Sequence, residues 1–517
     1  MDEQKEYSFT GRKRIYTDER VIDESNILQV LRDALITHSQ NADRIRFLLN
    51  YEAGYQPLTR EKKVRSDIDI KVCDNVANQI TEFKLGYNWG NPIEFVQRSN
   101  DHPKGSNKDT EDSAITLLNN MLKCEYKNTK DQELARYIEI CGVGYRLIDI
   151  KRDCEDGEAV FDISILNPLF AFVVYTNDAY RKPVMACSFR TVENGNSYYT
   201  CYTKDTRFEI INAVKIVSRE KKDNYMVANQ YTELNPLGMI PIIEYNRSAD
   251  RMGCFERQIS DMDNLNILIS DFTNDVDQGT QAVWHLNDVE LPTDENGDSI
   301  TPKSNEWLNT QTTRDGKQPF VKPLATEYDY QGMLENIKYR RDVIMQKCSV
   351  PLRSEPGGGS TGTAMSMSSG WSDAECSASK EALIIEQSEL QALKVILKAI
   401  KKSPDVPADS ELLKLTASDI EIRFIRNKTY DMATKANAFA TYIGHGIHGR
   451  DALAMVDATS NIEAVYTNSK DTIEAYQKSI FEKLNNTNNE NPPNNDRTLS
   501  DNSDQTDNSP ILGSNVK

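Results

Sequence analysis

The sequence has no long hydrophobic run and no paired cysteines. No apolar stretch approaches the roughly 20 residues needed to cross a bilayer, and the N-terminus, MDEQKEYSFTGRKR, is too polar for a secretion signal. The nine cysteines are scattered singly, without a CxxC pair or the His/Cys spacing of a zinc ribbon. We therefore expect an intracellular chain with no membrane contact, no disulfide framework and no structural metal.

An excess of basic charge is also absent. The chain has 61 Lys and Arg against 79 Asp and Glu, a net charge of −18. This argues against wrapping DNA through a broad basic surface, because counterion release requires clustered lysine and arginine. A length of 517 residues exceeds the roughly 250 to 300 residues that one core usually supports. We expect several structural units and, at most, local or weak DNA contacts.

Motifs for catalysis or nucleotide binding are missing. The stretch GGGSTGTAMSMSSGW, residues 357–371, has the glycine density of a phosphate-binding loop, but Thr363 follows Gly362 where the Walker motif needs lysine. CGVGYR at 141–146 has Leu147 where a dinucleotide fingerprint needs its third glycine, so it indicates a tight turn or close packing. GxSxG, HExxH and the kinase motifs do not occur. We predict no catalytic residue and no cofactor.

The first half of the chain combines helical and strand patterns. Residues 25–50 and 64–85 carry apolar residues at mixed three and four spacing, which predicts helices. From about 145 to 245, segments such as AVFDISIL, LFAFVVY and SYYTCYT are rich in β-branched and aromatic residues, which predicts strands. The fold class is therefore α+β.

Two amphipathic helices are predicted around a small β-rich module. Residues 253–283 place an apolar stripe opposite an acidic and polar face. A second helix follows at about 330–348 and presents Lys338, Arg340, Arg341 and Lys347 outward. Between them, 284–329 holds short strand candidates and Asn-Gly and Asp-Gly turn signals.

Beyond the glycine stretch, helical spacing returns. A third long helix is predicted at 374–401, a strand at IEIRFIR and a largely helical region at 431–474. The tail from residue 485 has too few apolar residues to offset chain entropy, so we expect it to be disordered.

The order of these segments resembles the portal proteins of tailed double-stranded DNA bacteriophages, particularly those of long-tailed phages that infect Gram-positive hosts. The resemblance covers most of residues 45–475. It is carried by YEAGYQPL, DNVANQITEFKLGYNWGNPIEF, LARYIEICGVGYRLI, MDNLNILISDFTNDVDQ and IEIRFIRNKTYDMATKANAF. Each motif alone is weak, and their shared order is the more specific signal.

The resemblance implies a ring, usually of twelve subunits, at one capsid vertex of the virion, assembled in the host cytoplasm. Double-stranded DNA would pass through the ring during packaging and ejection. The terminase large subunit, a head-completion protein and the major capsid and scaffolding proteins would be its partners. It also implies this division: flexible arm 1–24, wing 25–252, first stem helix 253–283, clip 284–329, second stem helix 330–349, tunnel loop 350–370, wing return 371–430, helical crown 431–483 and disordered tail 484–517.

The same resemblance suggests which residues meet DNA. The tunnel loop would face it with Gly357, Gly358, Gly359, Ser360, Thr361, Gly362 and Thr363. Lys338, Arg341 and Lys347 are candidates for sparse phosphate contacts, or equally for salt bridges between subunits, and the acidic channel-lining candidates are Asp261, Asp271 and Asp275. Two other functions stay open: a capsid adaptor or scaffold that never touches DNA, and a nucleotide-hydrolysing motor.

Overall fold

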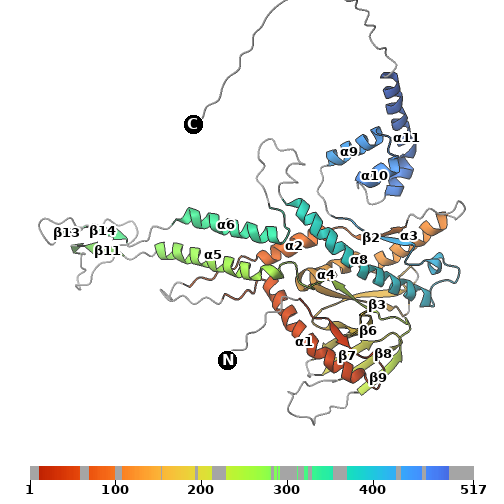
Figure 1. Cartoon of the computed structure of the whole chain (residues 1–517), viewed down its shortest axis with the longest axis horizontal. Helices are drawn as coiled ribbons and strands as arrows, with labels where there is room; N and C mark the ends of the chain where they lie inside the picture. Colours follow the sequence, from red (N-terminus) through yellow and green to blue (C-terminus); the bar gives the residue numbers. More distant parts are fainter. Residues whose placement is uncertain are drawn as a thin grey trace, which may run out of the picture. The chain divides into compact units, whose positions relative to one another are not determined.

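The computed structural model describes most of the chain outside the tail and several connecting segments (Figure 1). The described residues are 11–58, 69–98, 108–152, 154–155, 157–192, 196–211, 229–280, 284–287, 289–290, 311–312, 320–323, 329–352, 370–426, 432–456 and 462–487. The chain forms two compact units, 1–427 and 428–517. The mixture of helices and sheets confirms the α+β class.

The larger sheet of the first unit has the strand order β1-β5-β6-β7-β8-β9. Its strands are β1 (Ile15–Thr17), β5 (Ala171–Thr176), β6 (Pro183–Thr191), β7 (Ser197–Tyr202), β8 (Thr206–Ile211) and β9 (Asn229–Leu234). All neighbours are antiparallel except β1, which runs parallel to β5. Helix α1 (Ile27–Glu52) packs its apolar face on this sheet. The strands predicted within 145–245 are thus confirmed.

The N-terminal segment departs from the expected flexible arm. From residue 11 onward it belongs to the sheets and helices formed by residues 11–252, named here the wing: Ile15 pairs with Val174, and Arg12 is buried in a salt bridge with Glu256. Because β1 has three residues and its partner lies about 160 positions away, neither hydrophobic periodicity nor a local turn signals this pairing.

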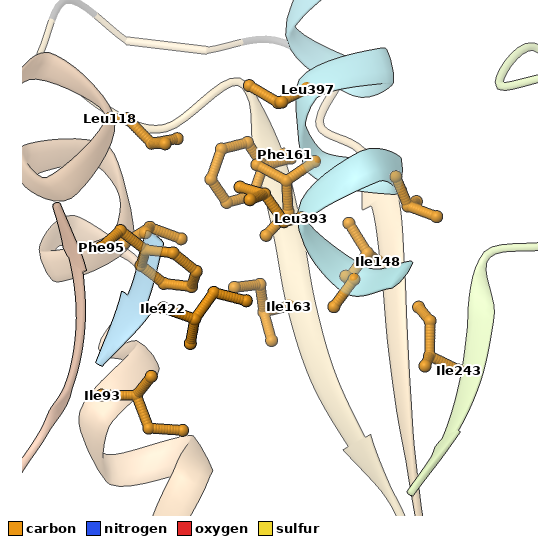
Figure 2. Close-up of a cluster of buried hydrophobic side chains, with 14 of the residues drawn as sticks. Ile93, Phe95, Leu118, Ile148, Phe161, Ile163, Ile243, Leu393, Leu397 and Ile422 are labelled. Atoms are coloured by element: carbon orange, nitrogen blue, oxygen red, sulfur yellow. The ribbon is translucent and has the colours of Figure 1, made fainter. Parts of the chain in front are cut away.

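A second core lies between a smaller sheet and four helices. The sheet has the order β10-β3-β4, with β3 (Val143–Ile150), β4 (Phe161–Leu166) and β10 (Ile242–Asn246), while β2 (Ile93–Gln97) pairs with β15 (Ile420–Phe424). The helices are α2 (Val76–Asn88), α3 (Lys108–Cys124), α4 (Lys127–Cys141) and α8 (Trp371–Lys402). Figure 2 shows Phe161, Leu393 and Ile422 meeting there from β4, α8 and β15. A short 3-10 helix, Glu411–Lys414, adds Leu412 to this core.

Buried salt bridges connect α8 to this core. The fully buried Arg146 of β3 pairs with Asp131 of α4 and, at 2.8 Å, with Glu389 of α8, and Lys127 lies 3.5 Å from Glu389. Burial alone raises the pKa of Glu389, but Arg146 and Lys127 outweigh it and hold that pKa below its ordinary value. The long helix is therefore fixed by directional contacts as well as by apolar packing.

Between the sheets and α8, two long helices enclose two short strand pairs, in the order predicted. The helices are α5 (Ile259–Thr280), which follows the 3-10 helix η1 (Glu256–Gln258), and α6 (Tyr330–Lys347). In the strand pairs, β11 (Trp284–Asn287) pairs with β14 (Phe320–Pro323), and β12 (Val289–Glu290) pairs with β13 (Gln311–Thr312). Figure 1 shows α5 and α6 side by side. The strand pairs confirm the β character of 284–329.

The second unit is helical where it is described, as the sequence predicts. It consists of α9 (Met432–Gly444), α10 (Gly449–Val456) and α11 (Ile462–Thr487). Gly449 lets α10 approach α11 closely, because a Cβ at that position would lie 2.5 Å from Ile473. Helix α11 continues to Thr487, past the predicted start of the disordered tail at 484, and the rest of that tail lies outside the described residues. Among the described helices of both units, none combines the length and apolar character that a membrane span requires.

Candidate functional site

The α5–α6 hairpin is the feature that the sequence analysis links to function. The two helices run antiparallel: the rings of Phe272 and Tyr330 meet edge to face at 6.0 Å near one end, and Lys347 lies 2.7 Å from Asp261 near the other. Met262, Leu265 and Ile344 are buried between the helices and the wing. Met262 and Leu265, three residues apart, belong to the apolar stripe predicted along one side of α5.

The base of this hairpin packs backbone against backbone on the wing. Gly142, in the CGVGYR motif, ends α4 with φ of 75°, and a Cβ there would lie 2.5 Å from the carbonyl oxygen of Arg251. A Cβ on Gly253 would lie 2.1 Å from the carbonyl oxygen of Ile140. The close-packing interpretation of CGVGYR is thus confirmed, and glycine is needed here for both conformation and space.

A second side of α5 carries a polar ladder, defined here as Asn266, Ser270 and Asn274. These side chains are buried and accept hydrogen bonds from backbone N–H groups of the segment 69–75. The N–H of Asp74 donates to Asn266 at 2.9 Å, that of Val72 to Ser270 at 3.0 Å, and that of Ile70 to Asn274 at 2.8 Å. Asn274 also donates to the carbonyl oxygen of Ile70 at 3.0 Å. Because the backbone of this segment bonds to α5, residues 69–75 are not helical, and the helix predicted at 64–85 is wrong before Val76 of α2.

The hydrogen bonds of the ladder repeat because the spacing of every fourth side chain on a helix matches the spacing of alternate residues in an extended chain. Four residues along a helix advance about 6 Å, and two residues of extended chain advance about 6.6 Å. Alternate backbone groups of 70–74 therefore meet every fourth side chain of α5, and the segment runs antiparallel to the helix. This satisfies backbone groups of the segment that have no sheet neighbour among the described residues.

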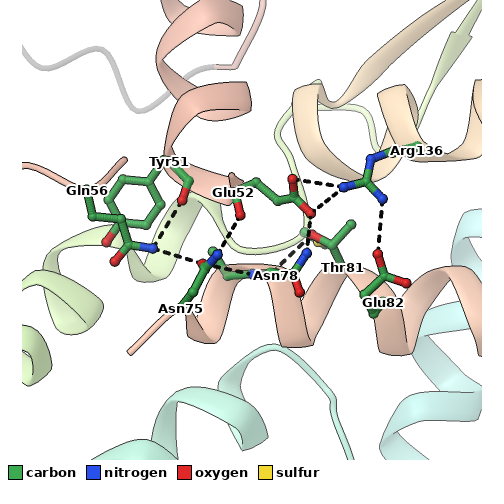
Figure 3. A network of polar contacts seen from close by, with 10 residues as sticks. Tyr51, Glu52, Gln56, Asn75, Asn78, Thr81, Glu82 and Arg136 are labelled. Carbon is green, nitrogen blue, oxygen red and sulfur yellow. Dashed lines mark hydrogen bonds and ion pairs between the residues drawn. The ribbon is translucent and has the colours of Figure 1, made fainter. Parts of the chain in front are cut away.

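The segment then leads directly into the wing through a polar junction (Figure 3). Asn75 caps α2 by accepting from the N–H of Asn78, and it donates to the carbonyl oxygen of Glu52 at 2.7 Å. The carboxylate of Glu52 binds Arg136 of α4 at 2.9 Å. Three helices of the wing therefore converge where the ladder segment ends.

Tyr51 joins this junction to α5. Its hydroxyl donates to Asp263 at 2.8 Å, and its backbone carbonyl accepts from Gln56 at 3.1 Å. Burial, and then the neighbouring Asp263, raise the pKa of Tyr51 far above its ordinary value, so the hydroxyl stays protonated as the donor. The side chain of Gln56 accepts from Asn266 at 2.6 Å, which ties the junction to the ladder itself.

A model of the family described as "Phage portal protein, SPP1 Gp6-like" matches residues 34–461. The chain belongs to this family. The match spans the wing, both hairpin helices, the intervening strand pairs and the glycine stretch, and it confirms the resemblance carried by the sequence motifs. A search of the curated proteins found no match for the chain. Portal proteins are structural components of the phage capsid, where they form a ring that interacts with other phage proteins and with DNA.

Two of the three basic candidates on this portal hairpin have partners within the chain. Arg341 lies 3.0 Å from Asp74 of the ladder segment and also donates to Gln79, while Lys347 pairs with Asp261. Lys338 is exposed and makes no ion pair with any residue that the structure describes. Lys338 therefore differs from Arg341 and Lys347 in having no ion-pair partner among the described residues.

The acidic channel-lining candidates also differ in their contacts. Asp261 holds Lys347, whereas Asp271 and Asp275 lie half-buried on α5, and Asp271 lines a small pocket together with Ile70 and the ladder. The tunnel-loop candidates, residues 357–363, lie outside the described residues. No group of His, Cys, Asp and Glu in the described part of the chain is arranged to hold a metal ion.

The ladder residues are the functional feature that the sequence analysis missed. Asn266, Ser270 and Asn274 follow at intervals of four, so that spacing marked a third, polar face on a helix for which only an apolar stripe and one opposite acidic and polar face were predicted. Their burial depends on a segment some 200 residues away, which periodicity within the helix does not indicate.

Proposed function

We propose that this chain is the subunit of a ring, with about twelve copies, that forms the channel for DNA packaging and ejection at one capsid vertex. The family match is the observation that carries the proposal. The hairpin supports it, because its two long helices have faces that a single chain leaves open, and a closed head-to-tail ring would cover them.

The parts of the subunit then take the roles that the resemblance implies. Helices α5 and α6 form the stem, 284–329 the clip that docks the terminase large subunit, 350–370 the tunnel loop, and 431–483 the crown. Head-completion, major capsid and scaffolding proteins attach to other surfaces of the ring. The polar ladder and the glycine contacts at Gly142 support a stem that is fixed firmly to the wing.

The charge distribution suits a channel that must let DNA slide. Each neutralised phosphate adds affinity, and breaking many such contacts repeatedly would slow translocation. Arg341 and Lys347 already have carboxylate partners, which reduces their attraction for phosphate. Lys338 is the basic stem residue that we propose for sparse phosphate contact.

Imaging of the purified protein tests the ring. Negative-stain electron microscopy should show closed rings with a central hole wide enough for duplex DNA. A protein that stays monomeric at micromolar concentration and moderate salt would contradict the proposal. Rings without an open channel would favour the alternative of a capsid adaptor or scaffold.

Deletion of residues 288–326 tests the clip. We expect no ATPase activity from the protein alone, because no lysine follows Gly362 to hold terminal phosphates. The intact ring should stimulate the ATPase of its terminase, and the deletion variant should still form rings without stimulating it. Unchanged stimulation would show that the terminase docks elsewhere, and intrinsic ATPase activity would favour the motor alternative.

A further inference from the structure

Two cysteines lie directly opposite each other in the larger sheet. Cys187 of β6 pairs in register with Cys201 of β7, and both are free thiols with 0% of their surface exposed. The sequence does not mark this pair, because its members belong to neighbouring strands and follow no CxxC spacing. The antiparallel register of β6 and β7 brings them together.

The backbone hydrogen bonds between β6 and β7 determine which kind of pair this is. At the hairpin end, the N–H of Val192 donates at 3.0 Å to the carbonyl oxygen of Asn196, the residue opposite it, so these two form a hydrogen-bonded pair. Hydrogen-bonded and non-hydrogen-bonded pairs alternate along antiparallel strands. Cys187 lies an odd number of positions, five, from Val192. Cys187 and Cys201 are therefore a non-hydrogen-bonded pair.

Pairs of this kind bring side chains closest together. Their Cα atoms lie about 4.5 Å apart, within the range of about 4.4 to 6.8 Å that a disulfide spans. Two other pairs of the same kind in this hairpin show such contact. The hydroxyls of Thr191 and Ser197 lie 3.1 Å apart, and the rings of Phe189 and Tyr199 stack at 5.3 Å. One S–S bond can therefore join the two cysteines without moving the strands.

The two thiols lie on the side of the sheet that α1 covers (Figure 1). In one row across the sheet, Phe172 of β5 lies next to Cys187, and Phe208 of β8 lies next to Cys201. Leu31 of α1 belongs to the same apolar cluster. Burial raises the pKa of Cys187 well above its ordinary value, and the neighbouring Cys201 raises it further. The thiolate is the reactive form, so the closed wing protects the pair from reaction.

We infer that Cys187 and Cys201 form a dithiol–disulfide site in the wing, which a peroxide oxidises when α1 opens locally. One thiolate attacks an oxygen of the peroxide, the O–O bond breaks, and a sulfenic acid forms as hydroxide leaves. The second thiolate attacks that sulfur, the S–S bond forms, and a second hydroxide leaves. The two thiol protons complete two water molecules, and the two sulfurs supply the two electrons that reduce the peroxide.

The disulfide joins β6 to β7 beneath α1 and leaves the outer surfaces of the wing unchanged. It closes a loop of 15 residues, from 187 to 201, and so restricts the unfolded chain. In a portal assembled in the host cytoplasm, as proposed above, the pair stays reduced during assembly, and the bond forms after release from the cell. The site itself depends on the sheet alone, so its test is independent of the ring.

Peroxide treatment of the full chain, purified with a reductant that is then removed, tests the site. Trypsin cuts after Arg190, between the two cysteines, so the disulfide links peptides 182–190 and 191–204. After treatment with hydrogen peroxide and alkylation of the remaining thiols, mass spectrometry should find these peptides linked and two hydrogens lighter than their sum. Dithiothreitol should separate them. The oxidised protein should have a Tm at least about 2 °C above that of the reduced protein.

Single substitutions provide the controls. Cys201→Ala should lose both the linked peptides and the rise in Tm, whereas Cys141→Ala, at an equally buried cysteine, should keep both. Urea below the unfolding transition should speed formation of the bond at least about threefold, because α1 opens more often. Alkylation of the exposed Cys124 should proceed at the same rate with and without this urea. Far-ultraviolet circular dichroism should show both variants folded.

Three outcomes would overturn the site. In the first, the linked peptides form only above the midpoint of urea unfolding. In the second, Cys187 links mainly to other cysteines, within the chain or in a second copy. In the third, peroxide oxidises the exposed cysteines while the pair stays reduced even in mild urea. None of these outcomes bears on ring formation, and a protein that forms no rings would leave the peptide result unchanged.

Discussion

At the scale of single residues, two asparagines of α5 differ in burial and hydrogen bonding, because only one of them belongs to the ladder. Asn266 is fully buried, accepts from the N–H of Asp74 and donates to Gln56, whereas Asn264 is exposed. Asn266→Ala leaves two half-buried polar groups without this partner, so we expect it to lower the free energy of unfolding by about 1 to 3 kcal/mol. Urea unfolding followed by circular dichroism measures this loss.

Asn264→Ala is the matched control, since it makes the same substitution on the same helix. It should change the free energy of unfolding by less than about 0.5 kcal/mol. Equal losses from the two variants would show that the ladder adds nothing to stability. Unfolding of both variants should be measured under conditions where any rings are dissociated.

His38 gives the wing a defined dependence on pH. It is buried against Phe172 at 4.9 Å, and its Nε2 lies 2.9 Å from the carbonyl oxygen of Leu169. Burial lowers the pKa of His38 below its ordinary 6.5, and the hydrogen bond to Leu169 offsets this only in part. The unfolded chain therefore binds a proton below pH 6.5 that the folded chain does not, and stability falls as the pH falls from there.

We expect His38→Gln to flatten this dependence, because the amide can still donate to Leu169 but does not titrate. Thermal unfolding between pH 7.5 and 5.5 measures the slope for both proteins. His445→Gln is the control: His445 is exposed in the second unit, and its replacement should leave the slope of the first unit unchanged. A parent protein with no loss of stability below pH 6.5 would contradict the burial argument.

At the scale of helices and strands, two glycines of the portal motifs have opposite expected effects. Gly142 ends α4 with positive φ and touches the backbone of Arg251, so Gly142→Ala should destabilise the protein by at least about 2 kcal/mol. Gly86 lies inside α2, is exposed, and has no atom within 4 Å of a built Cβ. Gly86→Ala should therefore stabilise by up to about 1 kcal/mol.

Differential scanning calorimetry of the two variants checks both signs in one experiment. A stabilising Gly142→Ala would mean that the turn between α4 and β3 can relax. A destabilising Gly86→Ala would point to a contact of α2 with another subunit. These outcomes separate glycines that the fold requires from those that merely occur in a motif.

The same scale shows how far the sequence determines this fold. The helices α6 and α8 were predicted nearly to their ends because each repeats apolar residues over many turns, whereas α5 begins at Ile259, six residues after its predicted start at 253. The burial of single positions does not follow from this spacing: Leu334 of α6 and Leu383 of α8 are 47% and 70% exposed. Periodicity identifies an apolar face, and it does not say whether the same chain covers that face.

What escaped prediction depends on distant partners. Strand β1 and the ladder were missed for one physical reason: each is stabilised by contacts between residues 150 or more positions apart. For the candidate site, the sequence identified the hairpin and its charges, but it did not indicate that Arg341 binds Asp74 rather than another subunit or DNA. Side-chain partners follow from tertiary packing, which composition and spacing leave undetermined.

At the scale of the whole molecule, the glycine stretch gives a prediction about DNA movement. Residues 353–369 lie outside the described residues, so the prediction rests on their sequence. Ring symmetry cannot match the helical symmetry of duplex DNA, so neighbouring tunnel loops need different conformations around it, and glycine permits these at little steric cost. Replacing Gly358 and Gly359 by proline would restrict the backbone angles that must differ.

The prediction is completed by a second variant in which Ser360 and Thr361 become lysine, because the two variants should fail for different reasons. Both should still form rings, since the apolar stripes of α5 and α6 are unchanged, and both should package DNA slowly in a reconstituted assay. Added lysines create phosphate contacts that salt weakens, so higher salt should partly restore packaging by the lysine variant. Restricted backbone angles do not respond to salt, so the proline variant should stay slow. Normal packaging by the proline variant would make the stretch a passive linker between α6 and α8, and the adjustment to DNA would then have to come from the stem itself.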